Sequence, residues 1–336
     1  MRVLIVGAAG FVGRHLVAEC VGSGDDVTGT YLADAAASAP DEAGVRWLPL
    51  DLLDEGSIDR ALETARPEGI VHVAGQANVS AAAADPIAAF RVNAEGTVRL
   101  LNSAQRHVPA ARVVVVTSAE VYGAVPAEEL PAAEDRPLAP RTPYGVGKAA
   151  ADFAAEQAWV VRRQPVIRMR PFNHVGPGQR LGFVAPDFAR QIATIERGER
   201  PPVLEVGNLS ARRDFTDVRD IARGYRLALE QGRPGAAYNL CSGRSWAIEE
   251  IVEELLGRAR CEIEVRPDPA RMRPSEIPEF RGDSTRAREE LGWEPRIDLA
   301  RSLGEVLEEW REASASPAAG RTADAPPPID GVGRVP

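Results

Sequence analysis

Short apolar runs alternate with amphipathic segments over the first half of the chain. The runs at residues 2–6, 27–31, 47–50, 70–74, 112–116 and 165–170 have the length and continuous hydrophobicity of buried strands. Helical periodicity separates several of them, over residues 15–21, 88–106 and 144–162. Strands that alternate with helices are typical of parallel sheets, because each crossover runs over one face of the sheet. Residues 1–170 are therefore predicted to form a doubly wound parallel α/β sheet.

The pattern changes beyond residue 170, where elements become short and turn residues frequent. Helices are predicted over residues 184–196, 221–230 and 247–256, with further helices before residue 312, and strands over 202–206 and 237–240. We therefore expect a smaller C-terminal α/β domain over residues 171–312, from which the chain returns to the sheet. Residues 313–336 are rich in Ala, Pro and Gly and lack periodicity, which predicts a disordered tail.

Composition narrows the class of protein. The net charge is −9 over 336 residues and no basic cluster is visible, so neither nucleic acid nor membrane is an expected partner. Three widely spaced cysteines do not form a disulfide framework, and four histidines without a Cys-x-x-Cys motif predict no metal site. No apolar run reaches the ~18 residues of a membrane helix, and no signal peptide precedes the first strand. We expect a cytoplasmic protein.

A glycine-rich turn follows the first strand at once. Its sequence is Gly-x-x-Gly-x-x-Gly over residues 7–13, and a helix comes next. Glycines let the backbone approach a pyrophosphate, whose charge the N-terminus of the helix stabilises. The turn predicts a dinucleotide site whose candidate residues are Gly7, Gly10, Phe11, Val12 and Gly13.

The end of the second strand bears on the choice of cofactor. NAD sites usually have an acidic residue there, whereas this chain has Tyr31, with Asp34 a few residues late and no arginine close behind. NADP(H) is therefore the expected cofactor, with NAD(H) possible. Further candidates at strand ends, where a cofactor would lie, are Asp51, Leu52, Ala74 and Gly75.

Tyr144 and Lys148 are the candidate catalytic pair. Four residues apart on one helix face, they bring a phenol and an ammonium together, which predicts a phenol pKa lowered toward neutrality. Such a phenol can exchange a proton with an oxygen on a reacting carbon. Ser118 and Glu120 follow the strand over residues 112–116, and the carboxyl ends of parallel strands are where chemistry occurs in open α/β sheets.

Together these motifs resemble the extended short-chain dehydrogenase/reductases over residues 1–312. The stretches Arg-Pro-Phe-Asn-His-Val-Gly-Pro-Gly-Gln (170–179) and Asp-Phe-Thr-Asp-Val-Arg-Asp (214–220) are similar to the branch that modifies GDP-mannose. Within it they resemble the GDP-4-keto-6-deoxy-D-mannose reductases more than the GDP-mannose 4,6-dehydratases. The resemblance implies a Rossmann-type NAD(P)-binding domain and reduction of the 4-keto sugar by NAD(P)H to GDP-D-rhamnose. It also implies a homodimer through a four-helix bundle.

The resemblance also implies a set of residues that bind the nucleotide sugar. Arginine pairs with phosphate in a bidentate manner, so Arg213 and Arg273 are the expected partners of the diphosphate. The full expected set is Ser118, Glu120, Asn173, Asn208, Arg213, Arg273 and Glu276.

Alternative functions remain open. Glu120 stands where the dehydratases place the base that removes the carbon-five proton, although the arginine-rich segment that they have after the second strand is missing here. A nucleotide-sugar 4-epimerase is weakened by the missing acid at Tyr31. A cofactor-binding sensor without chemistry is weakened because Ser118, Tyr144 and Lys148 are all present.

For the dimer, the helices over 88–106 and 144–162 are the candidates, with Ala149, Ala150, Ala151, Ala154, Ala155, Phe153 and Trp159 as contacts.

Overall fold

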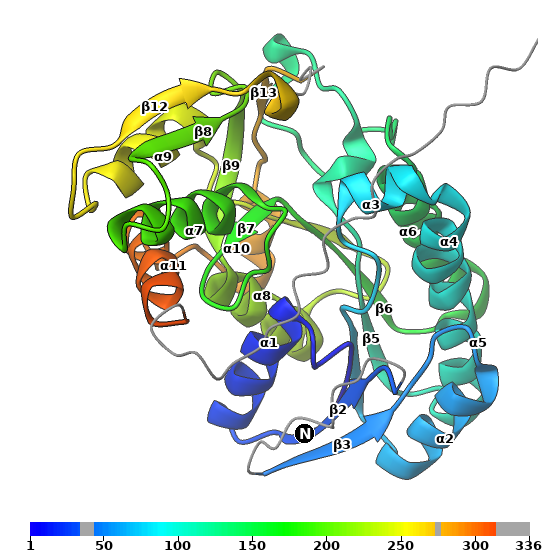
Figure 1. Ribbon diagram of the computed structural model, residues 1–336. Helices are drawn as coiled ribbons and strands as arrows, with labels where there is room; N and C mark the ends of the chain where they lie inside the picture. The colour runs from blue at the N-terminus through cyan, green and yellow to red at the C-terminus, as the bar shows by residue number, and fades with distance from the viewer. Residues whose placement is uncertain (34–43, 273–276, 314–336) are drawn as a thin grey trace, which may run out of the picture.

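A seven-stranded parallel sheet forms the centre of the computed structural model, which describes residues 1–33, 44–272 and 277–313 (Figure 1). The strand order is β10-β6-β5-β4-β1-β2-β3, and all six neighbouring pairs are parallel. This confirms the predicted doubly wound α/β fold. The strands are β1 (Arg2–Val6), β2 (Asp26–Tyr31), β3 (Val45–Pro49), β4 (Gly69–His72), β5 (Arg112–Val116), β6 (Val166–Pro171) and β10 (Ala237–Leu240).

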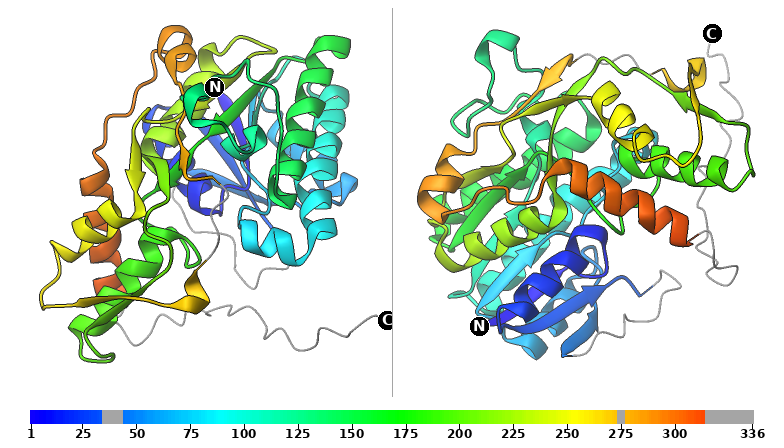
Figure 2. Two further views of the ribbon diagram at one scale, coloured as in Figure 1. Left: turned by 90° about the horizontal axis from the view of Figure 1, so that it is seen from above. Right: turned by 90° about the vertical axis from the view of Figure 1, so that its left-hand side faces the viewer.

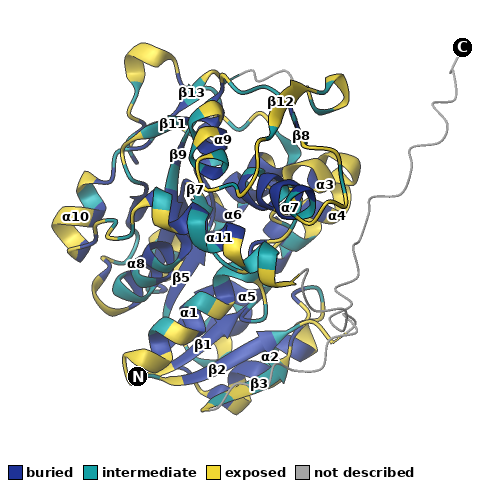
Figure 3. Cartoon of the chain, turned by 60° about the vertical axis from the view of Figure 1, so that its left-hand side comes forward, coloured by how far each residue is buried: buried dark blue, intermediate teal, exposed yellow. Residues whose placement is uncertain are grey.

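Helices cover both faces of this sheet (Figure 1). α1 (Phe11–Gly22) and α8 (Val218–Gln231) pack on one face. α2 (Glu55–Ala65), α5 (Gly96–His107) and α6 (Pro143–Arg162) pack on the other. The strands of the sheet and the helix residues that face it are buried, dark blue in Figure 3, and each fully buried aliphatic side chain contributes about 1.5–3 kcal/mol.

The helix predicted over residues 88–106 is present and unbroken from Pro86 to His107, and it contains a π-helical turn. It consists of α4 (Pro86–Phe90), the π-helical turn η1 (Arg91–Glu95) and α5, and the short helix α3 (Val79–Ala84) precedes it. The Thr97 hydroxyl donates to the Asn93 carbonyl within this turn at 2.7 Å. A π-helical turn of this kind is common beside functional sites.

The second half forms smaller sheets on one side of the large one (Figure 2). β9 (Arg212–Asp217) pairs with β11 (Ser245–Ala247), β13 (Glu279–Phe280) and β7 (Asn173–Val175), and β8 (Val203–Val206) pairs with β12 (Glu264–Pro267). α7 (Val184–Glu196), α9 (Ile248–Leu256) and α11 (Leu299–Ala313) enclose a separate apolar core with these strands, and α10 (Thr285–Leu291) packs beside β10. β10 itself lies next to β6, so the chain re-enters the large sheet.

The outer face of α6 differs from the expected one. Ala149, Ala151 and Ala155 are buried within the chain, and Trp159 packs on Gly235, where an added Cβ would lie 2.1 Å from the Trp159 ring. Phe153, one of the expected contacts, is exposed, and the other exposed apolar residues on α4, α5 and α6 are Ile87, Phe90, Val98, Val146, Val160 and Val161. Over the described residues, no helix has the length and apolar character needed to cross a membrane.

Candidate active site

The glycine-rich turn joins β1 to α1 in a shape that only glycine permits. Gly7 has φ +93°, and a Cβ there would lie 2.7 Å from the Ala74 Cα. A Cβ on Gly13 would lie 2.3 Å from the Gly7 carbonyl oxygen. No side chain caps the N-terminus of α1 at Gly10, so its first N–H groups face the turn without a side-chain acceptor. The turn therefore fits the pyrophosphate of a dinucleotide.

The other predicted cofactor residues lie along the same edge of the sheet. Tyr31 ends β2 half-buried, and its carbonyl accepts from the Leu50 N–H at 2.9 Å. Asp51 is exposed after β3 and its carboxylate accepts from Leu53 N at 2.8 Å, whereas Leu52 is buried. Asp34 lies outside the described residues.

Ala74 and Gly75 follow β4 and meet both neighbouring segments. Ala74 lies against Gly7, and its N–H donates to the Val6 carbonyl at 2.8 Å. A Cβ on Gly75 would lie 3.3 Å from Lys148 Nζ. The turn after β1, the loop after β4 and the lysine of α6 thus come together at one place.

Ser118 and Tyr144 meet at the end of β5. Ser118 is buried and caps η2 (Ala119–Tyr122), where its Oγ accepts from Glu120 N at 3.2 Å. Tyr144 lies in the first turn of α6, which Thr142 caps by accepting from Gly145 N at 3.0 Å. The side chains of Ser118 and Tyr144 share a hydrogen bond, which lowers the phenol pKa against the larger effect of burial.

The pKa of Tyr144 moves in the direction opposite to the prediction. Burial raises it to about 12, and the nearby carboxylate of Glu120 adds to this. Burial also lowers the pKa of Lys148 to about 8. The Lys148 ammonium donates to the Val116 carbonyl at 3.0 Å. The predicted lowering of the phenol pKa by Lys148 is wrong for the chain by itself, because burial dominates the pKa of this phenol. The phenol is therefore neutral near pH 7, which is the form that can give a proton.

Lys148 is also the only lysine among the 40 Lys and Arg residues of the sequence. Arginine serves at every other basic position, although its larger, always charged guanidinium could not replace a compact ammonium in this buried place. The single lysine of the sequence therefore indicates the site independently of the spacing between Tyr144 and Lys148.

Glu120 and Arg213 lie close together where the two halves of the chain meet. Burial raises the pKa of Glu120, and the charge of Arg213 opposes this. Burial lowers the pKa of Arg213, and Glu120 opposes that in turn. Arg213 also donates from Nη1 to the carbonyls of Arg212 at 2.8 Å and Ile277 at 2.9 Å. Strand β9 thus brings a predicted substrate residue to the catalytic loop after β5.

The remaining predicted substrate residues are less clearly placed. Asn173 is exposed on β7. The Asn208 side-chain oxygen accepts from Ser210 N at 3.0 Å and Ser210 Oγ at 2.8 Å, so it serves its own turn. Arg273 and Glu276 lie outside the described residues.

Asn93 is a structural part of this site. It is buried in η1, where Oδ1 accepts from Gln76 N at 2.9 Å and Nδ2 donates to the Gln76 carbonyl at 3.1 Å. The Asn93 oxygen also lies 2.5 Å from the place of a Gly75 Cβ. Asn93 therefore fixes the loop after β4 beside Lys148, and its buried amide within a helical apolar pattern was the available signal.

His72 supports the same turn from the sheet. Its Nε2 lies 3.0 Å from Thr97 Oγ1, and the Thr97 hydroxyl donates its one proton to the Asn93 carbonyl. His72 must therefore donate from Nε2. Burial lowers its pKa to about 3, so it stays neutral.

Aromatic contacts connect the glycine-rich turn to the loop that follows β6. The Phe11 ring stacks on His174 with centroids 6.0 Å apart and meets His15 edge-on at 5.7 Å. His15 Nε2 lies 2.9 Å from the Pro177 carbonyl oxygen. The first turn of the cofactor candidate site and the 171–178 segment therefore form one contact surface.

Comparisons with known proteins agree with this geometry. A family model described as GDP-mannose 4,6 dehydratase matches residues 4–306. GDP-6-deoxy-D-mannose reductase of Pseudomonas aeruginosa is 37% identical over 92% of this chain and 97% of that protein. A dTDP-glucose 4,6-dehydratase of Streptomyces niveus is 31% identical over 94% of each chain.

A solved structure shares the fold. The structure of RMD from Pseudomonas aeruginosa complexed with NADPH has a TM-score of 0.81 and 35% identity, covering 93% of this chain and 100% of that chain. The family match extends over most of the chain and includes both halves. The protein belongs to the GDP-mannose 4,6-dehydratase family, within the extended short-chain dehydrogenase/reductases.

Proposed function

We propose that the chain reduces the 4-keto group of GDP-4-keto-6-deoxy-D-mannose with NAD(P)H and forms GDP-D-rhamnose, also called GDP-6-deoxy-D-mannose. The observation on which this rests is the alignment of nearly the whole chain with a GDP-6-deoxy-D-mannose reductase. The neutral phenol of Tyr144 beside Ser118 supports it, because ketone reduction needs a proton donor.

The proposed chemistry assigns one task to each catalytic residue. Ser118 Oγ accepts from Glu120 N, and its own proton, shared with Tyr144 in the chain by itself, would turn to the ketone oxygen. Negative charge grows on that oxygen during reduction, and Tyr144 neutralises it by giving up its phenolic proton. Lys148 uses one N–H on the Val116 carbonyl and keeps two for the nicotinamide ribose and the phenolate that forms.

For the cofactor we propose NADP(H) in preference to NAD(H). Gly7, Gly10, Phe11, Val12 and Gly13 would hold the pyrophosphate, while Tyr31, Asp51 and Leu52 would line the adenosine side. Ala74 and Gly75 would lie under the nicotinamide. When bound, the reduced nicotinamide supplies the hydride. The end of β2 presents no carboxylate at Tyr31 that would repel a 2′-phosphate.

We assign the nucleotide sugar to the junction of two domains, residues 1–170 for the cofactor and 171–312 for the substrate. Arg213 is the residue best placed to meet the diphosphate, because its charge already acts on Glu120 in the catalytic loop. Asn173, Asn208, Arg273 and Glu276 complete the proposed set. Glu120 would shape the pocket, since a reductase removes no carbon-bound proton.

A 4,6-dehydratase is the second candidate, and the buried Glu120 is the observation that favours it. Burial raises the pKa of this carboxyl, as a general base that abstracts a carbon-bound proton requires. The two functions differ in their use of cofactor. A reductase consumes one NAD(P)H in each turnover, whereas a dehydratase returns the hydride and leaves the cofactor unchanged.

One experiment separates them. The wild-type chain is incubated with GDP-mannose alone, and separately with the 4-keto-6-deoxy sugar nucleotide and NADPH, while NADPH absorbance is followed. We expect stoichiometric loss of NADPH only in the second mixture. Glu120→Gln should retain activity within about tenfold, because no proton transfer is lost. Glu128→Gln, an exposed carboxylate nearby, is the control. Consumption of GDP-mannose without net change in NADPH, stopped by Glu120→Gln, would establish the dehydratase instead.

We further propose a homodimer in which two helical segments of each subunit, the unbroken α4–α5 stretch and α6, form a four-helix bundle. Val146, Phe153 and Val160 recur every seven residues on the outer face of α6, and Phe153 is 55% exposed. Phe153→Glu should yield a monomer in light scattering, whereas Val265→Glu, at an exposed apolar residue of β12, should leave the dimer intact. A monomeric wild-type chain would contradict the proposal.

A further inference from the structure

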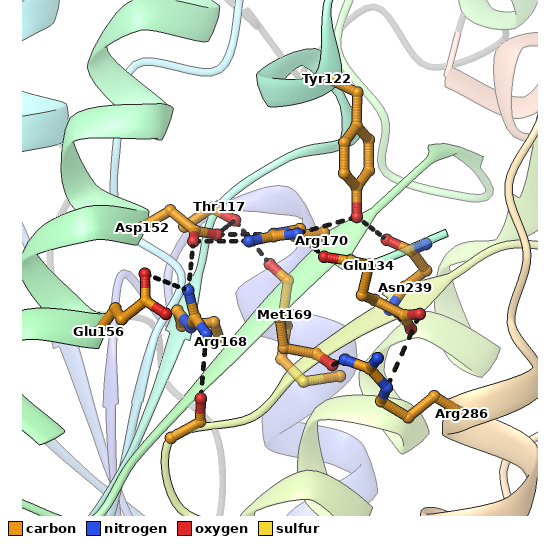
Figure 4. Close-up of polar contacts among 12 residues, drawn as sticks. Thr117, Tyr122, Glu134, Asp152, Glu156, Arg168, Met169, Arg170, Asn239 and Arg286 are labelled. Carbon is orange, nitrogen blue, oxygen red and sulfur yellow. Dashed lines mark hydrogen bonds and ion pairs between the residues drawn. The ribbon is translucent and has the colours of Figure 1, made fainter. Parts of the chain in front are cut away.

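Asp152 is a completely buried carboxylate on the catalytic helix. It lies on α6 four residues after Lys148 and eight after Tyr144. Arg170 binds it with two parallel hydrogen bonds, both 2.8 Å long, from Nε and Nη2 (Figure 4). Arg168 donates from Nη1 at 2.9 Å, and the Thr117 hydroxyl, which has one proton, lies 3.1 Å both from this carboxylate and from the Met169 carbonyl oxygen. Three donors from β6 and the shared hydroxyl at the end of β5 therefore fix one carboxylate of the helix.

The free edge of the Arg170 guanidinium faces the opposite way. Its Nη1 donates to the Tyr122 hydroxyl and to the Glu134 carbonyl, both at 3.0 Å (Figure 4). The Tyr122 hydroxyl in turn donates to Asn239 Oδ1 at 2.7 Å. One guanidinium thus joins helix α6 to the end of η2.

These contacts enclose the catalytic loop from both sides. Thr117 directly precedes Ser118, and Tyr122 comes two residues after Glu120. Thr117 binds Asp152 directly, and Tyr122 reaches it through Arg170. Both ends of the Ser118–Glu120 segment are therefore held to the helix that provides Tyr144 and Lys148.

Stability alone does not account for such a cluster. Buried ion pairs often contribute no more to folding than well-packed apolar residues of the same volume, because both charges must be desolvated. Burial would raise the pKa of Asp152, yet the hydrogen bonds and charge of Arg170 hold it below its usual value, so the carboxylate is ionised. Two flanking ion pairs, Arg168–Glu156 and Arg286–Glu134, balance the remaining charge. What the arrangement does provide is a fixed geometry.

We propose that Asp152, Arg170 and Tyr122 are positioning residues that hold Ser118 and Glu120 in a fixed relation to Tyr144 and Lys148. The inference rests on the proposed reductase function, since turnover is its readout. We assign to the three side chains no contact with cofactor or substrate; they act through the segments that they connect.

The test compares two buried tyrosines. Tyr122→Phe removes only the hydroxyl between Arg170 and Asn239. Tyr238→Phe is the matched control, because Tyr238 is equally buried and its hydroxyl also accepts from one N–H, of Arg233, and donates to one oxygen, of Glu290. Those partners belong to the segment between α8 and β10 and to α10, away from the catalytic loop. Each variant is assayed for kcat, for KM of the keto-sugar nucleotide, for NADPH affinity and for thermal midpoint.

We expect similar thermal midpoints for the two variants, but a kcat lowered about tenfold or more only in Tyr122→Phe, because small misplacements of reacting groups are costly. KM and NADPH affinity should stay within about twofold, since the binding residues are untouched. Equal kcat values in the two variants would overturn the proposal. A wild-type chain that does not reduce the keto sugar would refute the proposed function instead, which is a distinct outcome.

Thr117 gives an independent second arm. Thr117→Val removes the hydroxyl that binds Asp152 at nearly constant volume, and Thr117→Ser restores it. We expect kcat to fall in the valine variant and to recover in the serine variant. Loss of kcat in both variants to the same extent would mean that packing of the methyl group matters, not the bond to Asp152, and would also overturn the proposal.

Discussion

The buried charge of Lys148 should lower the free energy of unfolding. Replacing Lys148 should therefore make the protein more stable while abolishing turnover. Burial lowers the pKa of this lysine from 10.5 to about 8. Each pKa unit corresponds to about 1.4 kcal/mol, so the charged form is disfavoured by about 3 kcal/mol in the folded state. The hydrogen bond from Nζ to the Val116 carbonyl offsets about half of this. Lys148→Met should gain about 1–2 kcal/mol at pH 7.

The sign of the pH dependence follows from the lowered pKa. Below about pH 8 the lysine is charged in both the folded and unfolded states, and the folded state bears the whole penalty. Between about pH 8 and 10.5 the folded state has released its proton while the unfolded state still holds it, so wild-type stability rises with pH relative to Lys148→Met. The advantage of the variant should therefore be largest at pH 7 and vanish near pH 10.

Chemical denaturation of both proteins without added cofactor, at pH 7 and pH 10, measures this difference. Because the sequence contains one lysine, selective ¹³C labelling of lysine Cε gives a single NMR signal whose titration reports its pKa directly. A titration midpoint near 10.5 would refute the reasoning. So would a Lys148→Met variant that is less stable than the wild type by the same amount at both pH values.

Three further predictions concern other residues. Tyr144→Phe should lower kcat about 10²-fold or more with little change in NADPH affinity, as measured by steady-state kinetics and fluorescence titration; full activity would exclude Tyr144 as the proton donor. Arg213→Ala should weaken nucleotide-sugar binding by roughly 1.5–3 kcal/mol in calorimetry and leave NADPH binding unchanged, whereas equal losses would mark the arginine as structural. Asp220→Ala should destabilise the fold by about 3 kcal/mol in urea denaturation, because its carboxylate accepts from Arg296 N and Ile297 N; a loss below about 1 kcal/mol would contradict this.

The large sheet could be predicted well from the sequence. β1 (Arg2–Val6), β5 (Arg112–Val116) and β10 (Ala237–Leu240) have the predicted bounds, because strands of a parallel sheet are buried on both faces and appear as continuous apolar runs. Helix α1 begins four residues earlier than predicted, since its first turn is also part of the glycine motif. Helix α2 (Glu55–Ala65) was not predicted, as few of its residues are apolar.

The candidate catalytic residues could be predicted from the sequence, but the contacts that hold them in place could not. Ser118, Tyr144 and Lys148 lie in short motifs with local spacing, and the structure brings them to the end of β5. Asn93 binds Gln76, 17 residues away in the sequence, and Asp152 contacts Thr117, 35 residues away. Such pairings depend on the packing of helices on the sheet, which one sequence does not specify.

In the motif over residues 212–220, Arg213 was assigned to substrate binding from the sequence, but most polar residues of the motif have structural contacts. Strand β9 was not predicted, because its charged residues break any apolar alternation. Each aspartate of the motif is nonetheless buried and binds a group distant in the sequence. Asp214 accepts from Ser242 N, Gly243 N and Gly282 N, and Asp217 accepts from Ser302 Oγ.

The resemblance of this motif to nucleotide-sugar enzymes therefore reflects its architecture more than contact with a substrate. Asp214 and Asp217 fix β9 at both ends of its polar stretch, against the loops after β10 and against α11. Arg213 stands directly before Asp214, so the contacts that fix the strand also fix the residue whose charge acts on Glu120. Removing either carboxylate leaves buried N–H or hydroxyl donors without partners, which lowers the free energy of unfolding. We expect activity to fall as well, because Arg213 would no longer be held in place.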